Sequence, residues 1–235
     1  MYMDLLEILV DELEEMIGEE ISTDELLLKA YKSKITDKEL IRFAEYIDDA
    51  YEMYLVSRLI QQAKEKGIKL DFSKHKYETV GLPQYIPFVV KRGRKRNPKF
   101  DSKIEQIKEI CYWCRGYSNP ADNIKIGFDG EKVVRLEIPF GYDESCLEEM
   151  IEYEFIKSNV LEMTKKEFLA EFRKLNVGMW AKDYSDPTIL DGTQWELEIK
   201  YEDGKTRKYS GSNDFPRTFY ALSKLVGDKF FEDEE

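Results

Sequence analysis

The chain contains very few of the residues on which many catalytic and metal sites depend. Its 235 residues include one histidine, three cysteines and three tryptophans. No H-E-x-x-H zinc motif, glycine-rich phosphate loop or Rossmann fingerprint is present. Three cysteines leave at least one thiol unpaired, which argues against a disulfide framework and favours a reducing compartment.

Long apolar runs are also absent. No stretch approaches the roughly 18 to 20 apolar residues that a spanning helix needs. The first 17 residues carry six acidic side chains, a pattern that excludes a signal peptide. We therefore expect a cytoplasmic protein that does not enter a membrane. The formal net charge of −12 argues against nonspecific nucleic-acid binding by the whole surface.

Residues 1–67 have helical patterning. Apolar residues recur every three to four positions from Leu5 to Ile17, and Gly18 is a typical stop. Ser22 with Glu25, and Thr36 with Glu39, have the spacing of capping boxes. The second box begins the longest helical stretch, which ends at Gly67. We predict a helical N-terminal segment.

Two β-hairpins are predicted in the rest of the chain. Alternating apolar residues flank Asp129-Gly130 and again Asp203-Gly204. Asp-Gly supplies the positive φ angles of a tight hairpin turn. Helices are expected before each hairpin, at 102–110 and 164–175, and after each, at 146–155 and 216–226.

An eight-residue pattern, W-x-x-x-Y-S-[D/N]-P, occurs before each hairpin. Its six defining residues are Trp113, Tyr117, Pro120, Trp180, Tyr184 and Pro187. We interpret it as structural, with Trp packed under the hairpin and the Ser-Asx-Pro portion forming a rigid turn. The alternative is a recognition surface, because Trp and Tyr provide large rigid contact areas.

These patterns predict an α+β fold. The helical segment, 1–67, would precede two tandem helix–hairpin–helix units at 68–160 and 161–227, and an acidic tail would follow at 228–235. The two hairpins would form one antiparallel sheet with helices on one face. The pairing of similar units suggests an internal repeat.

The run from Trp180 to Gly227 includes D-G-T-Q-W at 191–195 and G-S-N-D-F-P at 211–216. It resembles a module of uncharacterised bacterial proteins and covers about a fifth of the chain. The resemblance implies a bacterial-type intracellular protein, and it brings no activity and no catalytic residues.

A basic segment, residues 91–99, interrupts this acidic chain. It carries Arg92, Arg94, Lys95 and Arg96. These side chains are candidates for contact with a ligand or partner, and phosphate binding by them would depend strongly on salt. They could equally dock on an acidic protein surface or remain solvated.

Two sets of residues in the sequence are candidates for a metal site. Asp191, Glu198 and Lys200 match the acid and Glu-x-Lys set of metal-dependent nucleases, in which carboxylates hold Mg²⁺. The ordinary interpretation is a half-solvated strand.

Cys111 and Cys114 form a C-x-x-C that Cys146 and His75 would complete as a zinc set. Small buried thiols are the simpler interpretation.

We therefore predict a non-enzymatic binding protein without cofactor or bound metal. A protein partner is favoured over nucleic acid. The alternative is a metal-dependent phosphodiesterase that uses Asp191, Glu198 and Lys200.

Overall fold

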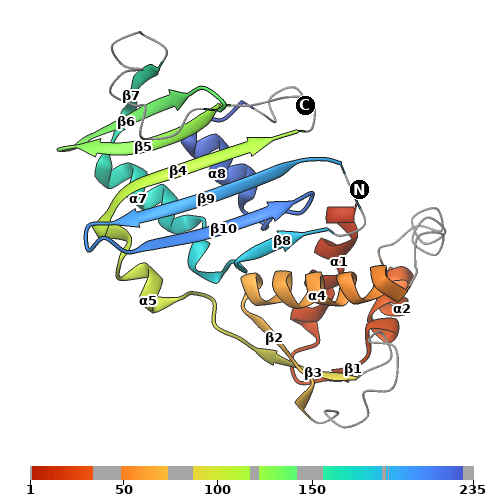
Figure 1. Ribbon diagram of the computed structural model, residues 1–235. Coiled ribbons are helices and arrows are strands. Elements are labelled where there is room, and N and C mark those ends of the chain that lie inside the picture. The colour runs from red at the N-terminus through yellow and green to blue at the C-terminus, as the bar shows by residue number, and fades with distance from the viewer. Residues whose placement is uncertain are drawn as a thin grey trace. The chain divides into compact units, whose positions relative to one another are not determined.

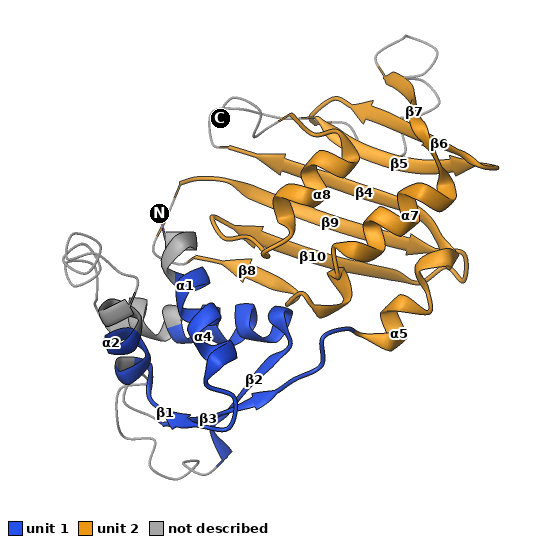
Figure 2. Ribbon diagram, turned by 180° about the vertical axis from the view of Figure 1, so that it is seen from behind, with its two compact units in different colours: residues 1–96 blue, residues 97–235 orange. Residues whose placement is uncertain are grey.

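The computed structural model describes residues 2–33, 49–73, 87–116, 122–141, 156–186, 189 and 191–229. The chain divides into two compact units, residues 1–96 and 97–235 (Figure 2). The sequence had predicted boundaries after residues 67, 160 and 227. The first unit extends past 67 because Ile68 and Val90 share one core with the N-terminal helices. No helix in the described part of the chain is long and apolar enough to cross a membrane.

The first unit combines helices with a three-stranded antiparallel sheet of order β1-β3-β2. Its elements are α1 (Tyr2–Glu15), β1 (Glu20–Ile21), α2 (Thr23–Ser33), α4 (Asp49–Lys66), β2 (Ile68–Asp71) and β3 (Phe88–Arg92). The Ser22–Glu25 capping box is confirmed, because each residue binds the other's backbone N–H. Thr36 and Glu39 lie outside the described residues. Small strands thus accompany the helices that the sequence predicted.

The second unit is a seven-stranded sheet of order β7-β6-β5-β4-β9-β10-β8. Its strands are β4 (Ile107–Arg115), β5 (Asn123–Asp129), β6 (Lys132–Ile138), β7 (Lys157–Thr164), β8 (Asp183–Ser185), β9 (Gln194–Tyr201) and β10 (Thr206–Ser212). Its helical elements are α5 (Pro98–Asp101), η3 (Ile104–Gln106), α7 (Lys165–Lys174), η5 (Val177–Met179) and α8 (Phe219–Val226). Neighbouring strands run antiparallel except β8, which is parallel to β10. Helices α7 and α8 cover one face (Figures 1 and 2).

Both hairpins are confirmed. β5 pairs with β6 around Gly130, and β9 pairs with β10 around Gly204. Both turn glycines have the positive φ that the Asp-Gly turns require. The capping box of Thr164 and Glu167 also begins α7 as predicted.

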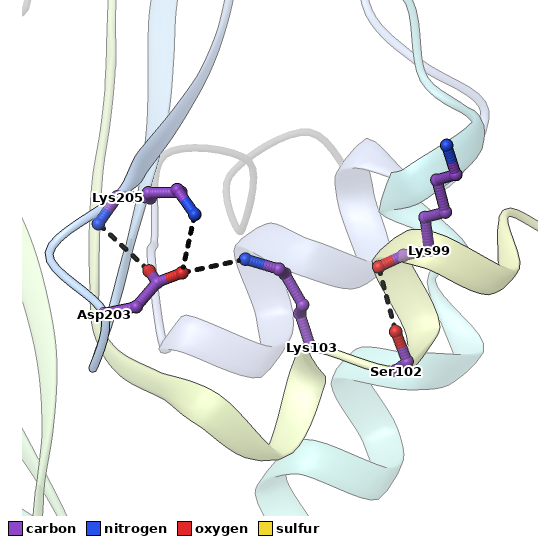
Figure 3. Close-up of polar contacts among 5 residues, drawn as sticks. All are labelled: Lys99, Ser102, Lys103, Asp203 and Lys205. Atoms are coloured by element: carbon purple, nitrogen blue, oxygen red, sulfur yellow. Dashed lines mark hydrogen bonds and ion pairs between the residues drawn. The ribbon is translucent and has the colours of Figure 1, made fainter.

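The helix predicted at 102–110 is wrong from residue 107 onward. Ile107 and Ile110 begin strand β4, which lies between the two hairpins and pairs with both β5 and β9. A register irregularity between Ile107 and Glu109 lets both isoleucines face the same core. This irregularity produces a three-residue apolar spacing that resembles a helix. Ser102 begins no helix either, and its hydroxyl donates to the Lys99 carbonyl instead (Figure 3).

The core of the second unit lies between the sheet and its two helices. Trp195, Leu197 and Ile199 of β9 face it, as do Phe168 of α7 and Phe219 of α8. The alternate residues of β9 therefore face away from the helices. The helix predicted at 146–155 lies outside the described residues.

Candidate binding surfaces

The basic segment spans the end of β3, a short connection and the start of α5. Arg92 is the last residue of β3, Arg94 lies just past it, and the chain bends at Lys95 and Arg96. All four side chains are exposed. The structure therefore presents the four cationic candidates to solvent within the first compact unit.

Glycines fix the backbone of this segment. The Gly93 N–H donates to the Gly67 carbonyl at 2.8 Å, which continues the β2–β3 pairing by one residue. A Cβ atom on Gly67 would come within 2.7 Å of Lys95 Cγ, so the lysine stem lies directly against this glycine. The segment is thereby tied to the end of α4.

Lys91, at the start of the same segment, is engaged by an acid. Its ammonium pairs with the carboxylate of Asp71 on the neighbouring strand at 2.5 Å. The hydrogen bond from Lys91, together with bonds from Ser73, holds the pKa of Asp71 well below its usual value. Lys91 therefore joins β3 to β2 through this ion pair. The candidates for contact with a partner begin at Arg92.

The open face of the large sheet is the one that faces away from α7 and α8. It carries a charge ladder, a row of alternating acids and lysines across the central strands. Glu109 of β4 pairs with Lys125 of β5 at 2.7 Å and with Lys200 of β9 at 2.9 Å. Glu198 pairs with Lys208 of β10 and lies 3.8 Å from Lys200. Burial by itself raises the pKa of Glu109, but the two lysines outweigh it and hold this pKa below its usual value. Alternating acids and lysines therefore link four strands, β5, β4, β9 and β10.

Of the three nuclease candidates, the structure brings together Glu198 and Lys200. Asp191 precedes β9, and its neighbour Gly192 lies against Asn213 beyond the end of β10. The four steps along the strand from Gln194 to Glu198 alone span about 13 Å. Asp191 is thus at the far end of the strand from the Glu-x-Lys pair.

The two described cysteines point to opposite faces of β4. Cys114 is buried in the core, whereas Cys111 lies half-buried on the open face with its thiol 3.5 Å from Glu109. Burial raises the pKa of the Cys114 thiol to about 12, and the charge of Asp228 contributes further. Side chains on opposite faces cannot bind one metal ion. Cys146 and His75 lie outside the described residues.

Across the described ranges, no three His, Cys, Asp or Glu side chains are grouped so that they could hold a metal ion. This finding covers the charge ladder as well as β4.

The two copies of the tryptophan pattern occupy different surroundings. Trp180 follows η5, is 3% exposed, and donates its indole N–H to the Thr218 hydroxyl at 3.1 Å. Tyr184 of the same copy is buried in β8. Trp113 lies half-buried in β4 on the face away from the helices. Tyr117, Pro120 and Pro187 lie outside the described residues.

Trp113 instead belongs to an aromatic–cation cluster that the sequence did not reveal. The guanidinium of Arg115 lies 4.4 Å from the ring centre of Trp113 and 4.4 Å from that of Phe140. The Phe140 side chain is 54% exposed. The W-x-R spacing in a strand was the available signal, because residues i and i+2 share a face. This cluster is a second surface with the composition of binding hot spots.

The D-G-T-Q-W and G-S-N-D-F-P runs at 191–195 and 211–216 have structural roles. The Trp195 indole donates to the Asp214 carbonyl at 2.8 Å and packs against Trp180 and Phe219. Asn213 adopts a positive φ, and its side-chain oxygen accepts from the Thr193 N–H. The D-G-T-Q-W and G-S-N-D-F-P runs therefore lock the two ends of one hairpin together.

Asp203 holds the turn of that hairpin. Its carboxylate accepts from Lys103 at 3.0 Å and from the backbone and side chain of Lys205 (Figure 3). The bond from Lys103, with those from Lys205, lowers the pKa of Asp203 to about 2. This cluster fastens the η3 region to the end of the sheet.

Comparisons with protein-family models, with curated proteins and with solved structures gave no match to this chain.

Proposed function

We propose that the protein is a non-enzymatic binding protein whose basic segment contacts an anionic partner. The observation that carries this proposal is the display of Arg92, Arg94, Lys95 and Arg96 on a chain of net charge −12. Four exposed cations in five residues stand out against such an acidic background. A local patch of opposite sign steers and orients a charged partner even when the whole protein repels it.

The local backbone supports a recognition role. The Gly93–Gly67 bond and the contact of Lys95 with Gly67 restrain the segment before any partner arrives. Restraint reduces the conformational entropy lost on binding, so exposed charges on such a segment bind better than the same charges on a disordered chain. We further propose a cytoplasmic, bacterial-type protein that acts through a protein partner.

The experiment is affinity purification from a cell lysate, followed by mass spectrometry. One variant replaces the four basic residues with alanine. The matched control replaces four exposed lysines of the second unit with alanine, which changes the net charge equally. These are Lys132, Lys166, Lys182 and Lys224. Partners retained by the control and lost by the basic-segment variant support the proposal. An identical partner set for wild type and both variants contradicts it.

The alternative function, a metal-dependent phosphodiesterase, has one supporting feature. Glu198 and Lys200 share the open face of β9 at 3.8 Å. Against it stand the remote position of Asp191 and the engagement of both side chains in the charge ladder. We therefore rank it second.

The tandem helix–hairpin–helix arrangement remains a prediction. Two hairpins with Asp-Gly turns in one sheet support it. Strand β4, in place of the first helix, and the different surroundings of Trp113 and Trp180 count against it.

A further inference from the structure

We infer that the partner contacted by the basic segment is an extended acidic polypeptide. This inference rests on the proposed function and names the chemistry of the partner. The four side chains comprise three arginines and one lysine. A guanidinium presents a planar fork of donors that matches a carboxylate with two parallel hydrogen bonds, whereas an ammonium acts as a point charge. The composition therefore favours oriented carboxylates over a diffuse counter-ion layer.

The spacing within the segment fits an extended partner. The Gly93–Gly67 bond keeps the backbone in its strand-like course past Arg92, so Arg92 and Arg94 stand two residues apart on an extended chain. Their Cα atoms are therefore about 7 Å apart. Alternate side chains of an extended peptide repeat at the same interval. Acidic residues at every second position would thus meet the two arginines in register.

Nucleic acid fits the same segment less well. Residues 91–99 contain no aromatic side chain, so the segment offers no platform on which exposed bases could stack. A duplex concentrates one charge per roughly 1.7 Å of axis, and its approach brings that charge against a protein of net charge −12. An acidic peptide has fewer charges and a small footprint. The repulsion from the rest of the surface is screened over about 8 Å at physiological salt, so a narrow peptide feels mainly the local cations.

The test measures direct binding to the full chain by fluorescence anisotropy. The probes are a labelled polyglutamate peptide, a labelled DNA duplex and a labelled single strand, each at low and at physiological salt. We expect saturable peptide binding that weakens with salt and that loses at least about tenfold in affinity when the four basic residues become alanine. The control variant with four exposed lysines of the second unit replaced should bind the peptide as wild type does.

A charge-preserving variant tests the role of the guanidinium forks. Replacing Arg92, Arg94 and Arg96 with lysine keeps every charge, and we expect weaker peptide binding than in wild type. Equal binding would overturn the assignment to oriented carboxylates.

The remaining outcomes separate this inference from the proposed function. Peptide binding that is absent, or that survives in the basic-segment variant, overturns the acidic-polypeptide inference. Tighter binding of either DNA through the same four residues also overturns it, yet leaves a binding role for the segment intact. The proposed function itself fails only if the basic-segment variant captures the same partners from lysate as wild type does.

Discussion

Gly211 of β10 lies directly against the Trp195 indole on the neighbouring strand. A Cβ atom at position 211 would come within 2.3 Å of the indole Nε1 and 2.5 Å of the Tyr184 carbonyl oxygen. Neither neighbour yields easily, because the indole is held by Asp214 and the carbonyl belongs to the backbone of β8. We expect Gly211→Ala to lower the free energy of unfolding by about 1–3 kcal/mol. Urea denaturation followed by tryptophan fluorescence measures this change.

Gly127 provides the matched control for that substitution. It also lies in a strand, β5, but a Cβ atom there would meet nothing within 4 Å. Gly127→Ala should therefore leave stability unchanged or raise it by about 0.5–1 kcal/mol, because alanine restricts the unfolded chain. Equal losses in both variants would show that the contact with Trp195 is not the cause.

The two tryptophans of the repeated pattern should differ sharply in their contribution to stability. Trp180 is 3% exposed and packs edge-on against Trp195 and Tyr209. Trp180→Ala should cost about 3–5 kcal/mol of unfolding free energy. Trp113→Ala removes a half-exposed ring stacked on Arg115 and should cost about 0.5–1 kcal/mol. Similar losses for both, measured by urea denaturation, would restore the equivalence that the sequence suggested.

Local signals explain what could be predicted from the sequence. The Asp-Gly turns and the capping boxes at Ser22 and Thr164 depend on residues a few positions apart, and they were predicted correctly. The α+β class followed from them, because hairpins and helices each need an apolar partner face. The exposure of the four basic side chains was also expected from their charge.

Distant partners explain what could not be predicted. The strand identity of Ile107 to Arg115 depends on pairing with β5 and β9, and the partners in β9 lie 79 to 94 positions away in the chain. Strand β7 at the sheet edge is exposed along almost its whole length, so it carries no alternating apolar signal. The aromatic–cation cluster of Arg115 and Trp113 also needs Phe140, whose position follows from the β5–β6 register. Pairing between elements overrode local spacing in each case.

Arg135 fastens the end of α8 to the sheet from within the core. Its guanidinium donates to the carbonyls of Val226 and Gly227 and to the Glu137 carboxylate. A cation at a helix C-terminus also complements the helix dipole. Arg135→Ala would leave these buried acceptors without their hydrogen-bond donor. We therefore expect a loss of about 3–5 kcal/mol in the free energy of unfolding.

Arg135→Lys separates charge from geometry at this position. Lysine keeps the cation but cannot reach three acceptors with a planar fork, so its loss should be smaller than that of alanine and still measurable. Wild-type stability in the alanine variant, measured by chemical denaturation, would contradict the role of Arg135 as the α8 anchor.

The Asp203 turn should give the protein a specific acid sensitivity. The folded-state pKa of Asp203 is lowered to about 2 from the ordinary 3.8, chiefly by the bond from Lys103. A lowered carboxyl pKa stabilises the folded state fully above 3.8, and this contribution is lost as pH falls through about 2. Asp203→Asn should therefore be less stable than wild type at neutral pH and converge with it below about pH 2. Paired thermal melts across this range measure the difference, and a pH-independent gap would refute the charge effect.

Because of the charge ladder, we expect Glu198 and Lys200 to support no metal-dependent cleavage of nucleic acid. A metal ion at Glu198 would have to compete with Lys208, and Lys200 is already held by Glu109 at 2.9 Å. Asp191, at the far end of the strand, cannot supply a third ligand to an ion bound there. Incubation of the protein with Mg²⁺ or Mn²⁺ and labelled nucleic acid should give no cleavage above that of a Glu198→Ala control. Cleavage that the Glu198→Ala change abolishes would instead establish the phosphodiesterase alternative, because the loss would assign the activity to the Glu-x-Lys pair. Cleavage that survives the change would remove Glu198 from any catalytic role and point to a different part of the chain.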